Sequence, residues 1–190
     1  MNTGSTGSTG SSSSIGSNAG KGDNSTEPAT GSNSISASSI NRDGGGTGGT
    51  IFLISGPNLD LLGTREPTIY GTATLDMHVE AAAEEARRLG YSIEHFQSNH
   101  EGEIVDFIHS ASGRAVAIIA NLGALTHYSW SIRDALAAYN GIIVEVHLSN
   151  PVAREGFRHV SVLADIADGS IAGFGGIGYT LAVKAVRALL

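Results

Sequence analysis

The sequence predicts an α/β fold, a flavodoxin-like, doubly wound sheet of five parallel strands. Short apolar runs rich in Ile, Val and Phe alternate with longer amphipathic stretches along residues 50–190. The amphipathic stretches also carry helix start and stop residues at their ends. Because parallel neighbours need long crossover connections, this alternation favours a parallel sheet covered by helices on both faces.

Five segments are predicted to be buried strands. Each is a short run of mainly aliphatic and aromatic residues, which is typical of strands that are covered on both faces. They are residues 50–54, 92–97, 115–120, 142–148 and 170–174.

Four segments between and after these strands are predicted to be helices. Thr74 and Asp76 suit a helix start and Gly90 suits its end, while Gly113 and Gly141 are further stop signals. The predicted helices are residues 74–89, 101–111, 129–139 and 178–190.

Residues 1–49 have a composition typical of a disordered tail. They are rich in Ser, Gly and Thr and contain few aliphatic residues, so they cannot bury enough apolar surface to offset their conformational entropy. The tail lacks the apolar core of a secretory signal, and residues 50–190 contain no apolar run long enough to span a membrane. We therefore expect a cytoplasmic protein with one folded domain, residues 50–190.

Composition excludes several classes of function. The net charge of −7 argues against a nucleic-acid surface, and the absence of cysteine removes thiolate nucleophiles and thiolate metal sites. Lys21 lies in the tail and Lys184 in the last helix, so no lysine stands at a strand end to form an imine. The histidines show no recognisable zinc spacing, and we expect no metal and no cofactor.

Polar side chains gather after the predicted strands, where sheets of this class form their sites. Each Asn or His taken singly is as well explained by helix capping or by satisfying backbone groups, so the case for a site rests on their convergence. The residues concerned are Asn58, Arg65, Tyr70, Gln97, Ser98, Asn99, His100, Asn121, His127, Glu145, His147, Ser149, Asn150, Arg154 and Arg158.

Glu145 and His147 form the most informative pair. Strand alternation places them on the same face, where the carboxylate can orient and charge the imidazole. A charged imidazole is a competent general acid. The alternative is a salt-bridged core pair without a catalytic role.

Tyr70 and Arg65 lie in the long loop after the first strand. A phenol has an ordinary pKa of about 10, and a neighbouring guanidinium favours its ionised form, so the pair could supply a strong base on a lid. The alternative is a surface tyrosine stacked on an arginine.

The segment GFGGIG, Gly173 to Gly178, satisfies the pattern of a dinucleotide-binding turn. Only twelve residues follow it and none is acidic, whereas the fingerprint requires an acidic residue about twenty positions further on. We interpret the segment as a tight turn before the last helix.

Several ordered motifs together resemble the type II 3-dehydroquinase family, the 3-dehydroquinate dehydratases of the shikimate and quinate pathways. The motifs cover nearly all of the folded domain, which is thereby identified as a catalytic domain of this type. They are GPNLDLLGTREPTIYG, FQSNHEGEIVDFIH, NLGALTHYSWSIRDAL, VEVHLSNPVAREGFRH and IAGFGGIGY.

The resemblance implies a lyase that needs no cofactor or metal and removes water from 3-dehydroquinate in the anti sense through an enolate. Tyr70 resembles the base and Arg65 the lid arginine that lowers its pKa. His147 resembles the general acid with Glu145 as its partner, and Asn58 resembles the residue that holds a water against the enolate oxygen.

The resemblance also implies substrate contacts and an assembly. The implied contacts to the carboxylate and hydroxyls of the substrate are Asn121, His127, Leu148 through its backbone, Ser149 and Arg158. Asp134 resembles a residue that reaches the site of a neighbouring subunit, in a homododecamer built from four trimers.

The chain departs from the family pattern at Ser55, Asp60, Leu122 and Leu125, none of which is a proposed catalytic group. Two other functions stay open on the residues alone: a flavodoxin-like module that binds a small anion, and an inactive paralogue. The sequence does not distinguish aromatic amino acid biosynthesis from quinate catabolism, because both use the same reaction.

Overall fold

The computed structural model of the chain describes residues 48–64 and 72–190. The predicted tail, apart from Gly48 and Gly49, lies outside the described residues, and so do the proposed base Tyr70 and the arginine Arg65. Gly48 and Gly49 belong to the folded part rather than the tail: the Gly48 N–H donates to the carbonyl of Gly90 at 2.9 Å, and the Gly49 carbonyl accepts from Ser92 at 3.0 Å.

The described residues form an α/β fold around one five-stranded sheet with the order β2-β1-β3-β4-β5. All strand pairs are parallel, as predicted. The order reverses beside β1, as in a flavodoxin-like doubly wound sheet. The strands are β1 (Thr50–Ser55), β2 (Ser92–Gln97), β3 (Ala115–Asn121), β4 (Ile142–His147) and β5 (Gly169–Ala172).

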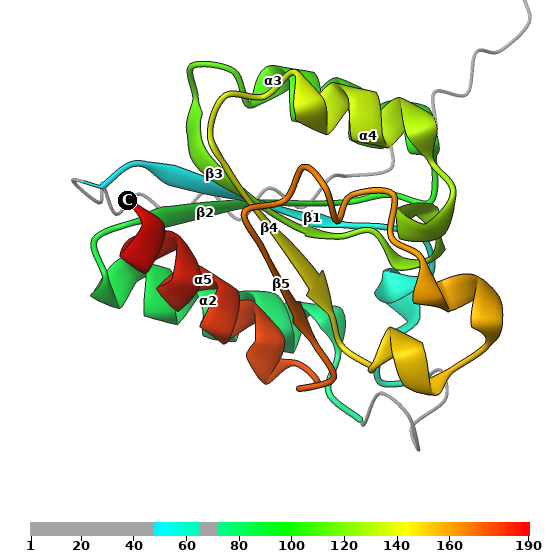
Figure 1. Cartoon of the computed structure of the whole chain (residues 1–190). Helices are drawn as coiled ribbons and strands as arrows, with labels where there is room; N and C mark the ends of the chain where they lie inside the picture. The colour runs from blue at the N-terminus through cyan, green and yellow to red at the C-terminus, as the bar shows by residue number, and fades with distance from the viewer. Residues whose placement is uncertain (1–47, 65–71) are drawn as a thin grey trace, which may run out of the picture. The chain divides into compact units, whose positions relative to one another are not determined.

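Helices cover both faces of the sheet (Figure 1). Helices α2 (Leu75–Arg88) and α5 (Ile177–Leu189) pack on one face, where their aliphatic residues join those of alternate strand positions in one core. Helices α3 (Glu101–Ser110) and α4 (Trp130–Ala137) pack on the other face around a second core. The continuous apolar runs in the strands follow from this burial on both sides.

Local signals set the helix ends close to the predicted positions. The side chain of Thr74 accepts from the Met77 N–H at 3.3 Å and caps α2, and Ser129 caps α4 by accepting from Ile132 at 3.1 Å. Gly90 takes a φ of 87°, a left-handed conformation that ends α2 at low cost.

Several strand bounds differ from the prediction by one or two residues. Strands β1 and β3 each end one residue later than predicted, at Ser55 and Asn121, and β5 begins one residue earlier, at Gly169. Strand β4 ends at His147, one residue before the predicted end. Strand β5 ends at Ala172, and Phe174, predicted to lie in a buried strand, is 62% exposed. The reason is the turn at Gly173 and Gly175, which have φ of 87° and 59° and whose N–H groups donate to His147 and Leu148.

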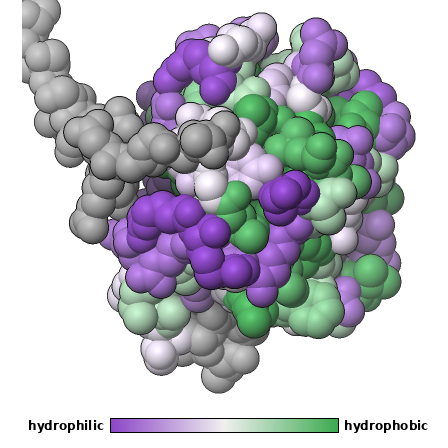
Figure 2. Space-filling model, turned by 90° about the vertical axis from the view of Figure 1, so that its left-hand side faces the viewer, coloured by the Kyte–Doolittle hydropathy of each residue, from purple (hydrophilic) through white to green (hydrophobic). Residues whose placement is uncertain are grey.

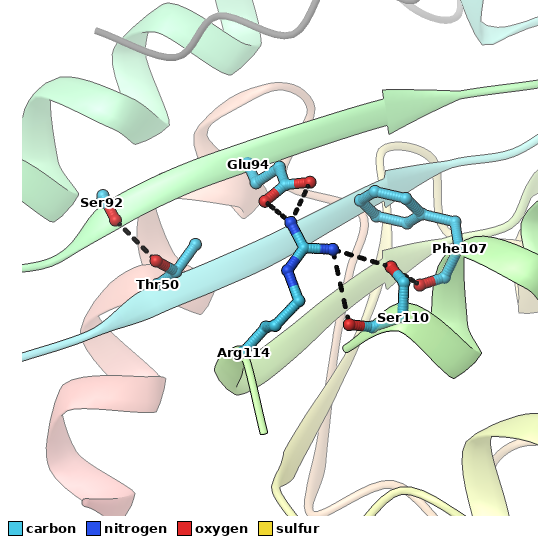
Figure 3. A network of polar contacts seen from close by, with 6 residues as sticks. All are labelled: Thr50, Ser92, Glu94, Phe107, Ser110 and Arg114. Atoms are coloured by element: carbon cyan, nitrogen blue, oxygen red, sulfur yellow. Dashed lines mark hydrogen bonds and ion pairs between the residues drawn. The ribbon is translucent and has the colours of Figure 1, made fainter. Parts of the chain in front are cut away.

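A polar network ties the edge strand β2 to α3 (Figure 3). Arg114, directly before β3, donates to both carboxylate oxygens of Glu94 at 3.0 and 2.7 Å and to the hydroxyl of Ser110 at 3.2 Å. Its guanidinium lies 5.1 Å from the ring centroid of Phe52, which stacks on Phe107. Since Arg114 and Glu94 are partly exposed, we expect their ion pair to contribute less than about 1 kcal/mol.

The side of the sheet at the carboxyl ends of the strands differs in character from the opposite side. At the carboxyl ends of the strands lie four short 3₁₀ segments, on the right in Figure 1: η1 (Leu59–Leu61), η2 (Gly123–His127), η3 (Pro151–Ala153) and η4 (Gly156–His159). Figure 2 shows the opposite edge, where hydrophilic and hydrophobic side chains are interspersed. Within the described ranges, no helix is both long and apolar enough to cross a membrane.

Candidate active site

A hollow opens at the carboxyl ends of the strands, where the loops after β1, β3 and β4 meet. Six of the predicted site residues line it, so the structure brings together side chains that are up to 37 residues apart in the sequence, from 121 to 158. The lining residues are Leu59, Asn121, Gly123, His127, His147, Leu148, Ser149, Pro151, Arg154 and Arg158.

Glu145 and His147 form the predicted pair on one face of β4. The Nε2 atom of His147 lies 2.8 Å from Oε1 of Glu145. Glu145 is 1% exposed, and the Ser161 hydroxyl donates to the same oxygen at 2.7 Å. Two partners on one oxygen hold the buried carboxylate in place, and the carboxylate in turn orients the imidazole toward the hollow.

His127 lies beside His147 in the hollow. Their ring centroids are 6.1 Å apart and the ring planes differ by 12°. The Nδ1 atom of His127 lies 2.7 Å from the carbonyl oxygen of Val160, the residue before Ser161. Because that carbonyl can only accept, Nδ1 carries the proton and Nε2 is an acceptor toward the hollow when His127 is neutral.

Two arginines give the hollow a positive side. Arg154 and Arg158 both line it, and both pair with Glu155 through Oε2, at 3.5 and 2.8 Å. A hydrogen bond to its own backbone and the Arg158 guanidinium hold the pKa of Glu155 below its usual range. Arg154 also lies 3.5 Å from the Ser149 hydroxyl. Guanidinium groups beside hydroxyl and amide groups suit a carboxylate ligand with hydroxyls.

Asn121 reaches the hollow from the end of β3 and is 3% exposed. Its Nδ2 donates to the phenol oxygen of Tyr179 on α5 at 2.8 Å. Burial raises the pKa of Tyr179 to about 12, and hydrogen bonds with Ser55 and Asn121 oppose that rise. Tyr179 therefore stays a neutral phenol behind the site.

The loop after β1 contributes one lining residue, Leu59. Asn58 has a φ of 64°, the one left-handed residue other than glycine in the described ranges, and its N–H donates to Oδ1 of Asn99 at 2.7 Å. This turn directs Leu59 into the hollow, whereas Asn58 itself is exposed and is not among the lining residues.

Besides Asn58 and the buried Glu145, three predicted site residues are not among the described residues that line this hollow. Asp134, on α4, has a side chain that is 80% exposed and lies 3.7 Å from that of Arg133. It is not a lining residue of its own chain's hollow. Arg65 and Tyr70 lie outside the described residues, so the structure does not test their predicted roles.

The structure brings to the site three residues to which the sequence assigned no individual role, although Arg154 was among the polar residues predicted to gather after the strand ends. Arg154 lines the hollow, Ser161 holds Glu145, and Tyr179 holds Asn121. Arg154 carried a signal, since it stands four residues before Arg158 in the segment after a strand end. Ser161 and Tyr179 carried none, because a lone Ser in a loop and a lone Tyr in a helix are ordinary.

The described part of the chain shows no group of three or more His, Asp or Glu side chains placed to hold a metal ion. The chemistry that the lining residues themselves can perform is proton transfer at His147, with anion binding by Arg158 and Arg154 and hydrogen bonding by Asn121 and Ser149.

Comparison with known proteins gives a consistent answer. A model of the family described as dehydroquinase class II matches residues 49–187. The 3-dehydroquinate dehydratase of Halalkalibacterium halodurans is 54% identical over 138 residues, which cover 72% of this chain and 94% of that protein. The catabolic 3-dehydroquinase of Emericella nidulans is 54% identical over 137 residues, 72% of this chain and 90% of that protein.

Solved structures agree with the sequence relatives. The crystal structure of type II dehydroquinase from Propionibacterium acnes superposes with a TM-score of 0.70 at 41% identity, covering 73% of this chain and 96% of that chain. That of type II dehydroquinase from Butyrivibrio crossotus superposes with a TM-score of 0.71 at 42% identity, covering 73% and 97%.

Proposed function

The chain belongs to the class II dehydroquinase family, and from this membership we infer that it is an enzyme, a type II 3-dehydroquinate dehydratase. We propose that it removes water from 3-dehydroquinate through an enolate, with Tyr70 as the base and His147 as the acid. The observation that carries this proposal is the Glu145–His147 contact of 2.8 Å at the edge of a hollow that also holds two arginines.

The first step is removal of a proton from the carbon next to the ketone. The ionised phenol of Tyr70 takes this proton, and the electron pair moves onto the ketone oxygen to form the enolate. Arg65 lowers the pKa of Tyr70 by stabilising the phenolate. Asn58 holds a water against the enolate oxygen; it is exposed at the turn after β1 and precedes Leu59, which lines the hollow.

The second step is loss of the hydroxyl that lies beta to the ketone. The enolate re-forms the ketone as the carbon–oxygen bond breaks, and protonated His147 gives its proton to the departing oxygen, so that water leaves. Glu145 is buried and accepts from His147, which stabilises the protonated ring and fixes its direction. Tyr70 then loses the proton that it gained, and His147 regains one.

The remaining lining residues bind the parts of the substrate that do not react. Arg158 pairs with the carboxylate, and Asn121, His127 and Ser149 with the hydroxyls and the carboxylate, aided by the backbone of Leu148. All five residues line the same hollow as His147.

We further propose the assembly of the family, a homododecamer of four trimers in which Asp134 reaches the site of a neighbouring subunit. Two observations support this proposal. Asp134 is exposed on α4, away from its own chain's hollow. Two large apolar side chains near the start of α4 are exposed, Tyr128 by 59% and Trp130 by 64%. Exposed apolar side chains that lie close together are typical of a surface that another subunit covers.

The activity is tested by mixing the purified full chain with 3-dehydroquinate, without added metal or cofactor, and following the ultraviolet absorbance of the conjugated enone. A parallel sample is treated with borohydride, which traps imines. Absorbance that grows equally in both samples is the expected result. No growth from protein that is shown to be folded and assembled would overturn the proposed activity and favour an anion-binding module or an inactive paralogue.

The pathway role is a separate matter, because relatives named as catabolic and relatives without that word are similarly close in sequence. Deleting the gene and comparing growth on quinate with growth without aromatic amino acids distinguishes the two roles. Loss of growth on quinate alone would indicate quinate catabolism, and a requirement for aromatic amino acids would indicate biosynthesis.

A further inference from the structure

The turn after β1 lies between the ends of two neighbouring strands. It comprises residues 56–59 and contains Asn58, the residue that we propose holds the enolate water. Strand β1 lies between β2 and β3, so the turn has the end of β2 on one side and the end of β3 on the other. The proposed mechanism gives no role to Gln97 and Asn99, which stand at the end of β2.

Residues 56–59 have the features of a type II turn. Pro57 stands at the second position, and Asn58 at the third has φ of 64° and ψ of 6°, the left-handed conformation that this turn type requires. The N–H of Leu59 closes the turn by donating to the carbonyl of Gly56 at 3.4 Å. Asparagine tolerates the left-handed region better than most residues do, because its short polar side chain can bond locally.

The alternative for such a segment is a type I turn, which differs in the direction of the central peptide. Passing from type II to type I rotates that peptide by roughly 180° and moves φ of the third residue from about +80° to about −90°. In this chain, the rotation would reverse the Asn58 N–H and the Pro57 carbonyl and would change the direction of the Asn58 side chain. That direction therefore depends on what holds the peptide between Pro57 and Asn58.

Both sides of this peptide have a fixed neighbour. The Asn58 N–H donates to Oδ1 of Asn99 at 2.7 Å, on the β2 side. The carbonyl oxygen of Pro57 lies on the β3 side, 3.2 Å from the position that a Cβ would take on Gly123. Because Gly123 has no side chain, the carbonyl fits there without a clash. The type II direction of the peptide thus matches both flanking strand ends.

The amide of Asn99 has one orientation that fits its contacts. A backbone N–H can only donate, so the atom 2.7 Å from the Asn58 nitrogen is the amide oxygen of Asn99. The side-chain nitrogen of Gln97 lies 3.4 Å from the same oxygen and 3.3 Å from the carbonyl oxygen of Gly56. Since that carbonyl can only accept, Gln97 presents its NH2 group to both oxygens.

We propose that Asn99 is a positioning residue, whose amide oxygen holds the Pro57–Asn58 peptide in the type II turn and thereby aims the Asn58 side chain at the enolate water. Asn58 and Asn99 are both exposed, so water would accept from the Asn58 N–H if Asn99 were truncated. Water can do so in either turn, whereas the oxygen of Asn99 favours one turn only. The loss of Asn99 therefore shifts the populations of the two turns. This inference rests on the proposed role of Asn58.

The kinetic test compares Asn99→Ala with Asn99→Asp in the full chain. Asn99→Ala removes the acceptor, and we expect kcat to fall about tenfold because Asn58 is aimed correctly in about a tenth of the molecules. KM should stay within about twofold, since the enolate forms only during the reaction. Asn99→Asp keeps an oxygen at the same position and should restore kcat to within about threefold of the wild type.

A double-mutant cycle tests whether Asn99 acts through Asn58. In the Asn58→Ala background, Asn99→Ala should change kcat by less than about twofold, because the group that Asn99 positions is gone. Asn140→Ala is the matched control. Asn140 is also an exposed asparagine in a loop, but it lies between α4 and β4 at the amino ends of the strands, so this variant should keep wild-type kcat and KM.

Three kinetic results would overturn the positioning role while the dehydratase function stands. They are an unchanged kcat in Asn99→Ala, an equal loss of kcat with and without Asn58, and a loss in Asn99→Asp as large as that in Asn99→Ala.

A second measurement needs no activity. Crystal structures of the wild type and of Asn99→Ala report φ of residue 58 directly. We expect a positive φ in the wild type and a negative φ in most molecules of Asn99→Ala. A positive φ in both would overturn the inference. A wild type without turnover of 3-dehydroquinate would instead overturn the proposed function, and it would leave this structural comparison unaffected.

Discussion

His147 and Glu145 stand two residues apart on β4, and Nε2 of His147 lies 2.8 Å from Oε1 of Glu145. The carboxylate is buried whereas the imidazole reaches the hollow, so the pair links the core of the α3 and α4 face to the site. Ser161 donates to the same Oε1 from another loop. Because His147 and Ser161 share this one oxygen, their contributions are measured by substituting Glu145 and Ser161 singly and together.

Glu145→Gln is expected to lower kcat by about 10²-fold with KM within about threefold, because a neutral amide stabilises the protonated His147 ring less well than a carboxylate does. The enone absorbance assay measures both constants. Glu94→Gln is the control. Glu94 lies on β2, away from the hollow, and pairs with Arg114, so this variant should retain wild-type kinetics. A raised KM with unchanged kcat in Glu145→Gln would mean that the pair only binds substrate.

Ser161→Ala is expected to lower kcat about tenfold, because Oε1 of Glu145 loses one of its two partners and the carboxylate is held less firmly. The effect should disappear in the Glu145→Gln background, in which the charge that Ser161 stabilises is already absent. Ser110→Ala is the control: the Ser110 hydroxyl donates to the Phe107 carbonyl at 2.7 Å, far from the hollow. Equal losses of kcat in both backgrounds would contradict a role through Glu145.

Tyr70→Phe is expected to abolish most turnover and leave binding of 3-dehydroquinate nearly intact, because only proton abstraction is lost. Turnover is followed by enone absorbance and binding by calorimetry. Wild-type turnover in this variant would remove Tyr70 from the role of base.

Arg65→Ala should likewise reduce turnover, and a loss through weaker substrate binding alone would contradict the proposed effect of Arg65 on the pKa of Tyr70.

Acid is expected to destabilise the fold through His95. Its pKa is about 4 in the folded chain and about 6.5 when unfolded, so between these values the unfolded chain binds more protons and stability falls as the pH falls. The free energy of unfolding should be about 3 kcal/mol lower at about pH 4 than above pH 6.5, where His95 is neutral in both states.

The measurement is the melting temperature at pH 7 and at pH 5 for the wild type and for His95→Gln. Between pH 7 and pH 5, the melting temperature of the variant should fall less than that of the wild type. His109→Gln is the control, because His109 is an exposed residue on α3. An identical pH dependence in the wild type and His95→Gln would show that His95 stays charged or solvated in the folded chain.

Gly56→Ala is expected to destabilise the chain by about 1–3 kcal/mol, because a Cβ at this position would lie 2.3 Å from the carbonyl oxygen of Leu122. Backbone atoms cannot move aside as a flexible side chain does. Gly102→Ala, in α3, is the control: a Cβ there meets nothing within 4 Å, and alanine should stabilise the helix by up to about 1 kcal/mol. Chemical denaturation compares the two variants, and equal stability would show that the strand ends separate easily.

The sequence was a sufficient guide to the sheet and to much of the site. Strand and helix periodicity, with capping residues such as Thr74 and Ser129, depends on neighbours along the chain, and the predicted elements were found within about two residues of their expected bounds. The pairing of Glu145 with His147 was also predictable, because residues two apart on a strand share a face. The motifs likewise predicted the family that the comparisons found.

Other features depend on contacts between segments distant in the sequence. Ser161 reaches Glu145 across 16 residues and Tyr179 reaches Asn121 across 58, and neither contact follows from a local pattern. Phe174 was predicted to be buried because it is apolar, whereas the turn at Gly173 leaves it 62% exposed.

The sequence by itself thus determined the elements, their parallel arrangement and the residue types available at the strand ends, since these depend on periodicity and chain direction. Only the tertiary structure decided which of those residues share one hollow and which buried partners orient them. The physical reason is that a buried polar group must find a hydrogen-bond partner, and which partner lies within reach is set by how α5 and the loop after η4 pack against the sheet.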